Sequence, residues 1–166
     1  GEKCPMSRGD LILTPTGRWH EHGHDGDQPV VWLDVLDLPL MYYLEVSYHL
    51  NGGRQAVKPG RGDRAYSRAG VVPTPVFGRA SQRYPMLRYP WADAKAALLS
   101  IAEDRADLQH VQVTYTNPET GEDAENVLGF HALMLRPGQT LALPARSPAC
   151  VYHAIEGRAR VSVQGH

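Results

Sequence analysis

The chain contains little cysteine and no excess of either charge, and both features narrow the class of protein. Two cysteines, Cys4 and Cys150, lie far apart in a sequence of 166 residues. Their spacing fits neither a disulfide framework nor the paired cysteines of a zinc ribbon, so a reducing, cytoplasmic environment is expected. The 17 basic residues nearly balance the 18 acidic ones, which argues against a nucleic-acid partner or an anionic membrane surface.

Long hydrophobic runs are also missing. No stretch approaches the roughly 18 consecutive apolar residues that a membrane-spanning helix needs. The content of hydrophobic residues, 42%, is nevertheless that of a globular protein with a core. The first residue is Gly1, and the sequence stops inside a strand-like alternation at residues 161–166. We therefore expect a soluble piece of a longer protein, with a small molecule as its partner.

Hydrophobic patterning predicts β-structure towards both ends of the chain and a helix between them. Residues 92–107 place apolar side chains along one stripe, which predicts an amphipathic helix. A short helix is expected within residues 39–50, and residues 51–90, rich in Gly, Pro and Arg, are expected to be a connector. Strands are expected in residues 10–14, 29–36, 111–116, 132–135, 151–155 and 159–163.

Three closely spaced histidines, His20, His22 and His24, follow a Pro-x-Gly turn at residues 15–17. In an extended segment, side-chain alternation would place the three imidazoles on one face, although Gly23 breaks the strand midway and would allow His24 to diverge. Imidazole suits zinc, iron, copper or nickel, and two or three histidines with open coordination positions suit a redox metal that binds substrate and oxygen. A solvated loop that binds metals only adventitiously is the alternative, and the cluster alone does not decide between them.

The spacing around the histidines resembles a motif of the cupins, a family of small metal-binding β-barrels. Gly9-x5-Pro15-x-Gly17-x2-His20-x3-His24 matches the second cupin motif at every position except the last, where the family has Asn. The stretch 135–157, with Pro144 and Arg146 at the ligand positions, resembles a first cupin motif that has lost both histidines. The two motifs therefore occur in reverse order, as they would across the seam between two barrels.

This resemblance implies a mainly β fold class, a fragment of a bicupin built from jelly-roll barrels. Residues 1–50 would be the C-terminal part of the first barrel and would carry the metal motif. Residues 51–107 would be a helical connector. Residues 108–166 would be the N-terminal part of a second, metal-free barrel.

Further motifs narrow the family. The stretches 19–23 (Trp-His-Glu-His-Gly), 32–39 (Trp-Leu-Asp-Val-Leu-Asp-Leu-Pro), 88–91 and 151–157 look like the gentisate 1,2-dioxygenase group, which includes salicylate and 1-hydroxy-2-naphthoate ring-cleaving enzymes. The resemblance is weakest in residues 51–85. It implies an oxidoreductase of aromatic catabolism that uses Fe(II) and both atoms of O2 to open the ring of gentisate or a related hydroxybenzoate. Gentisate would give maleylpyruvate, and the sequence does not settle which substrate is used.

The resemblance also assigns roles to individual residues. His20 would be one of three iron ligands, the other two being expected in a His-x-His motif upstream of this chain. His22 would bind substrate and transfer protons, and Asp34 would orient His22, with a strand-end cap as the alternative for Asp34. Trp19 could pack beside the substrate ring, although core packing is favoured for both Trp19 and Trp32.

Several alternatives stay open. A non-catalytic, metal-free cupin with a binding or structural role would keep the same motifs, and a free-standing zinc protein would need His24 as a third ligand. Arg88 would be either a substrate contact or a salt-bridged anchor. We expect the isolated chain to have little or no activity, and the full-length protein to be a homo-oligomer.

Overall fold

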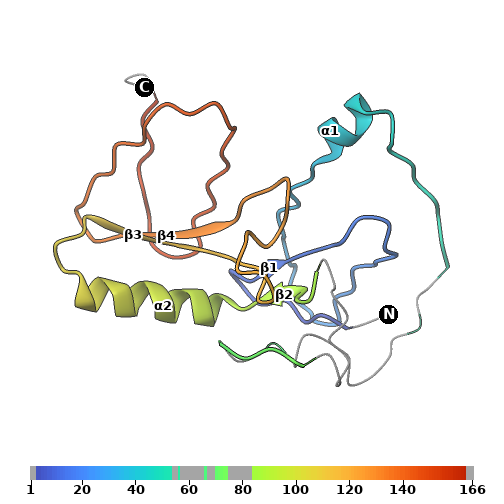
Figure 1. The fold of residues 1–166 in the computed structure, drawn as a ribbon, viewed down its shortest axis with the longest axis horizontal. Helices are drawn as coiled ribbons and strands as arrows, with labels where there is room; N and C mark the ends of the chain where they lie inside the picture. Colours follow the sequence, from blue (N-terminus) through green and yellow to red (C-terminus); the bar gives the residue numbers. More distant parts are fainter. Residues whose placement is uncertain (1–2, 54–55, 57–65, 67–69, 75–83, 164–166) are drawn as a thin grey trace.

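The structure is a computed structural model that describes residues 3–53, 56, 66, 70–74 and 84–163. The described part contains small antiparallel sheets and few helices, as expected for a piece of a cupin (Figure 1). Its elements, in chain order, are β1 (Leu11–Ile12), α1 (Leu38–Tyr43), β2 (Arg88–Tyr89), α2 (Trp91–Asp104), β3 (His110–Thr114) and β4 (His131–Leu135). None of the helices in the described residues is long and apolar enough to cross a bilayer.

The main core lies between α2 and the β3–β4 sheet, which run side by side in Figure 1. The apolar stripe of α2 buries Ala94, Leu98 and Ala102 against Val111 and Ala132 of the sheet. Leu98 is only 2% exposed, and burying a leucine of this kind contributes about 1.5–3 kcal/mol. The stripe that predicts the helix from the sequence is therefore the face that the helix buries.

The start of α2 is held by a carboxylate from the beginning of the chain. The residue before the helix is Pro90, whose side chain caps nothing. Asp10 takes that role, because its Oδ1 accepts a hydrogen bond from the Trp91 amide at 2.9 Å and its Oδ2 accepts one from Arg88 Nε at 2.8 Å. A negative charge at this position also suits the positive end of the helix dipole.

The opposite end of α2 is held by Arg136, which directly follows β4. Its Nη2 donates hydrogen bonds to the carbonyl oxygens of Ala102, at 2.6 Å, and Arg105, at 3.2 Å. These carbonyls belong to the last turn, where no further intrahelical donor follows. Both ends of α2 are thus fixed by side chains from outside the helix.

A second, smaller core joins the beginning of the chain to the stretch before α2. Leu11 pairs with Tyr89 across β1 and β2, and the Leu13 amide continues the pairing by donating to Leu87 O at 2.8 Å. Leu13, Tyr89 and Ala124 are buried together in this cluster. Partly buried Tyr115 packs against both cores and so connects them.

The helix expected in residues 92–107 is confirmed as α2, and the one within residues 39–50 as α1. The strands expected in 10–14, 111–116 and 132–135 correspond to β1, β3 and β4. The strands expected in 29–36, 151–155 and 159–163 are wrong for this structure. A strand requires a neighbour that completes its backbone hydrogen bonds, and in the described residues nothing pairs with these three stretches. Most of the connector expected in residues 51–90 lies outside the described residues.

Candidate metal and substrate site

The turn that precedes the histidines forms as the Pro-x-Gly pattern predicts. The Arg18 amide donates to Pro15 O at 3.2 Å, which closes a four-residue turn. Gly17 has a φ of +71° at the third position of this turn, where a type II turn requires a positive φ and therefore favours glycine. The turn follows β1, so it places Trp19 and His20 directly beyond the smaller core.

The local contacts of His20 leave one ring nitrogen available for a metal. His20 is exposed, and its Nδ1 lies 3.4 Å from Arg18 O. A carbonyl oxygen only accepts hydrogen bonds, so this long contact favours the tautomer with the ring proton on Nδ1 and the lone pair on Nε2. A backbone carbonyl that fixes the tautomer in this way is common behind metal-binding histidines.

His22 lies next to His20, whereas His24 is directed elsewhere. The ring centroids of His20 and His22 are 5.7 Å apart in an edge-to-face arrangement, and the ring of His22 stacks on Trp32 at 5.0 Å. His24 Nε2 donates to Gln28 O at 2.7 Å. The expected strand is wrong, because residues 20–24 form none. His24 diverges, as a break at Gly23 would allow, and His20 and His22 come together.

The donor atoms of this pair fit a first-row transition metal in type but not in number. Neutral imidazole nitrogen is a suitable ligand for iron or zinc. Within the described residues, however, no group of three or more His, Cys, Asp or Glu side chains is placed to hold a metal ion. The alternative of a self-contained zinc site built from His20, His22 and His24 therefore has no support in the geometry.

The two other predicted site residues differ in their surroundings. Asp34 is exposed, and within the described part of the chain it makes no hydrogen bond or ion pair with His22; it caps no strand either, since residues 29–36 form none. Trp19 and Trp32 are 54% and 47% exposed. The expectation that both tryptophans are core residues is therefore wrong for this structure.

Trp19 and His20 line a surface hollow of about 550 Å³. The other lining residues are Glu21 and, from the stretch that follows α1, His49, Leu50, Asn51, Gly52 and Gly53. The sequence gives His49 and Asn51 no site role, because they belong to no recognised motif. The only signal was two polar residues just before a Gly-Gly pair, which is typical of an ordinary loop.

Arg88 is a structural anchor rather than a member of the site. Its Nε forms an ion pair with Asp10 Oδ2 at 2.8 Å, and the side chain of Asp10 is only 4% exposed. Of the two alternatives for Arg88, the salt-bridged anchor is therefore confirmed. Its guanidinium supports the junction of β1, β2 and α2.

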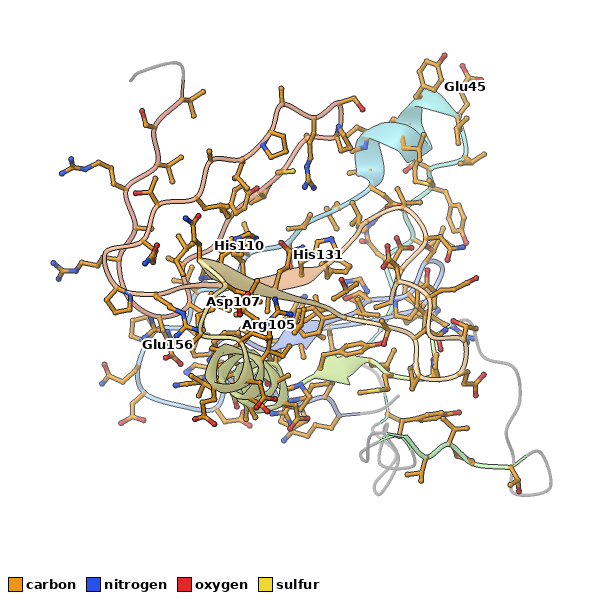
Figure 2. The ribbon with its side chains drawn as sticks, turned by 60° about the vertical axis from the view of Figure 1, so that its left-hand side comes forward. Glu45, Arg105, Asp107, His110, His131 and Glu156 are labelled. Carbon is orange, nitrogen blue, oxygen red and sulfur yellow. The ribbon has the colours of Figure 1, made fainter. Side chains whose placement is uncertain are left out.

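A second polar junction fixes the stretch that resembles the degenerate cupin motif. Glu156 lies beside α2 (Figure 2), where it accepts hydrogen bonds from Lys95 Nζ at 2.8 Å and from Trp91 Nε1 at 2.9 Å. The bonds from Lys95 and then Trp91 lower the pKa of Glu156 below its ordinary value. Arg8 adds a hydrogen bond to Ile155 O at 2.5 Å. This half of the chain thus contributes structural contacts.

Comparison with known proteins agrees with these motifs. Residues 1–36 match the family model described as "Cupin domain". A gentisate 1,2-dioxygenase from Ralstonia sp. is 73% identical over 163 residues, which is 98% of this chain and 46% of that protein. This chain is a homologue of the gentisate 1,2-dioxygenases. The fold class predicted from the sequence, part of a cupin protein, is confirmed by the family match.

Other relatives of this chain, at lower identity, carry related names. A 5-aminosalicylate 1,2-dioxygenase from Comamonas sp. is 32% identical over 99% of the chain and 45% of its own length. A 1-hydroxy-2-naphthoate 1,2-dioxygenase from Nocardioides sp. is 33% identical over 95% of the chain and 41% of its own length. The chain therefore spans less than half the length of these relatives. No solved structure matches it significantly.

Proposed function

We propose that this chain is part of an enzyme that opens the aromatic ring of gentisate, or of a related hydroxybenzoate, with both atoms of O2. The observation that carries this proposal is the 73% identity to the Ralstonia gentisate 1,2-dioxygenase over 98% of the chain. The relatives named for 5-aminosalicylate and 1-hydroxy-2-naphthoate support the same substrate class, an aromatic acid with a hydroxyl group next to the carboxylate. Maleylpyruvate would be the product from gentisate. We place the enzyme in cytoplasmic aromatic catabolism, as a homo-oligomer.

The proposed cofactor is ferrous iron, with His20 as one ligand through Nε2. The free lone pair on that nitrogen supports this assignment. The remaining ligands would come from parts of the protein that this chain does not include, since the described residues bring together no group of three ligands. Bound iron would supply redox chemistry with O2 and a positive charge for the substrate carboxylate.

The residues around His20 would bind and orient the substrate. His22, held by its stacking on Trp32, would exchange a proton with a substrate hydroxyl, a role that suits imidazole near neutral pH. Trp19, half exposed beside the hollow, would cover one face of the aromatic ring. Asp34 would orient His22 once the rest of the protein completes the site.

The test measures iron content and gentisate turnover in the full-length protein that carries this chain. We expect His20→Ala to lose bound iron and activity together. We expect His22→Ala to keep its iron while kcat falls by about 10²–10⁴-fold, the usual range for removing a general acid–base group.

His24→Ala is the matched control, because His24 is bonded to Gln28 O and directed away from the pair. It should keep both iron and turnover. Iron retention in His20→Ala would contradict the ligand assignment, and loss of metal in His24→Ala would favour the zinc alternative. A parent protein that binds no iron and consumes neither gentisate nor its relatives would point instead to a non-catalytic cupin.

A further inference from the structure

The stretch of residues 48–53 lies against the segment that carries the metal motif. A Cβ atom built on Gly52 would lie 2.6 Å from Cζ3 of Trp19, so the indole ring occupies the space that any larger residue would need. Four residues earlier, Tyr48 Oη lies 3.9 Å from the position of a Cβ on Gly17. The close approach of Gly52 to Trp19, with Tyr48 near Gly17, therefore aligns the two segments along the hollow.

His49 is brought by this alignment to the same hollow as His20. The volume of about 550 Å³ is sufficient for an acid with a single aromatic ring. His49 Nε2 lies 3.0 Å from Asn51 Oδ1. With the amide oxygen of Asn51 as the acceptor, the assigned tautomer has its proton on Nε2, and Nδ1 of His49 is left as a hydrogen-bond acceptor.

We propose that His49 is a substrate-binding residue that recognises a ring hydroxyl by accepting its hydrogen bond at Nδ1. This inference rests on the proposed function. The His20 side of the hollow would receive the carboxylate and the hydroxyl next to it, so His49, on the other lining segment, faces the far side of the ring. In gentisate that side carries a second hydroxyl group, which salicylate lacks.

The experiment compares gentisate with salicylate in the full-length, iron-loaded protein. Anaerobic calorimetry measures the Kd of each compound, and oxygen uptake measures KM and kcat. For His49→Ala we expect the Kd and KM of gentisate to rise about five- to tenfold, the usual effect of losing one hydrogen bond to a substrate hydroxyl. The Kd of salicylate should stay within about twofold of the parent value, since salicylate has no hydroxyl for His49 to bind.

His153→Ala is the matched control, because His153 is also an exposed histidine but does not line the hollow. It should leave both compounds unaffected. An unchanged Kd of gentisate in His49→Ala would overturn the inference, and so would equal weakening of both compounds, which would indicate a general effect on the shape of the site. If the parent protein binds neither compound, the proposed function itself fails.

A second pair of variants tests the placement of the segment. Gly52→Ala introduces a methyl group into the space of Trp19, whereas a Cβ on Gly53 would meet nothing within 4 Å. We expect Gly52→Ala to weaken gentisate binding and to change the fluorescence of Trp19, while Gly53→Ala does neither. Equal behaviour of the two variants would show that the segment is not aligned through Trp19.

Discussion

Glycine allows distant parts of this chain to pack closely together, because it has no side chain. Gly9 has a φ of +86°, and a Cβ on it would lie 2.7 Å from Ile155 Cγ2 and 2.8 Å from Trp91 Cγ. The cupin-like spacing singled out Gly9 from the sequence alone. Its neighbours could not be predicted, because the contact with Ile155 depends on how the whole chain packs.

We predict that Gly9→Ala is among the most destabilising single changes in the described residues. The positive φ costs about 1–2 kcal/mol for a residue with a Cβ, and overpacking adds about 1–3 kcal/mol. Gly138→Ala is the matched control, since Gly138 has a φ of +76° but nothing within 4 Å of its Cβ position. Urea unfolding should give Gly9→Ala the larger loss in unfolding free energy. Equal losses would mean that the close packing contributes nothing.

At the scale of elements, α2 shows what periodicity can and cannot predict. Its apolar stripe is a local pattern, and the sequence therefore predicts the helix and its buried face. Its stabilising end contacts come from Asp10 and Arg136. No local pattern indicates which distant carboxylate or guanidinium will reach a helix end, so these contacts appear only in the structure.

We predict that Asp10→Asn destabilises the protein by about 2–4 kcal/mol, because it removes the buried negative charge that accepts hydrogen bonds from both the Trp91 amide and Arg88 Nε. Asp93→Asn is the control, since Asp93 is also an acid in the first turn of α2 but is exposed. Its loss should cost about 0.3–1 kcal/mol through the helix dipole. Thermal unfolding of both variants distinguishes the two effects, and similar Tm values would contradict the capping role of Asp10.

The contact of Glu156 with α2 should depend on pH. Hydrogen bonds from Lys95 and Trp91 hold the pKa of Glu156 below its ordinary value of 4.5. A lowered pKa in the folded state means that this contact stabilises fully above pH 4.5 and is lost as the pH falls through the lowered pKa. We expect a fluorescence change of Trp91 in that acid range. The change should disappear in Glu156→Gln, and its persistence there would assign it to another group.

At the scale of the whole molecule, the expected barrels are not closed in the described residues. The part of the chain that the structure describes forms two two-stranded sheets. In that part, stretches with strand-like sequences, such as 29–36 and 151–163, pair with no other strand. Large apolar side chains there stay exposed, among them Val31 at 96% and Val161 at 73%. Alternation in the sequence predicts the capacity to form a strand, but pairing depends on neighbours that a local pattern does not contain.

The site follows the same rule. The proximity of His20 and His22 could be predicted, because two residues of one motif are close in any conformation. His49 could not be predicted, because its position depends on the packing of Gly52 against Trp19. Non-local packing therefore limits how much of the hollow the sequence reveals.

We predict that the 166-residue chain produced alone binds a hydrophobic dye, self-associates and shows little or no turnover of gentisate with added ferrous iron. Exposed apolar stretches of this extent favour association, and the described residues gather too few metal ligands. Light scattering, dye fluorescence and oxygen uptake test the three points, with the full-length protein as control. Full turnover by the chain alone would show that its own residues complete the site.

The hydrogen bond from Arg8 to Ile155 O joins two residues that are 147 positions apart, so it forms only late in synthesis on the ribosome. The first strand and its capping Asp10 emerge long before their partners, since Arg88 follows Asp10 by 78 residues. At about 5–20 residues per second, Ile155 is added roughly 7–30 s after Arg8. During that interval the segment that carries His20 and His22 lacks the partners that hold β1 in the folded chain, so under the proposed function iron would bind only after translation has passed the middle of the chain.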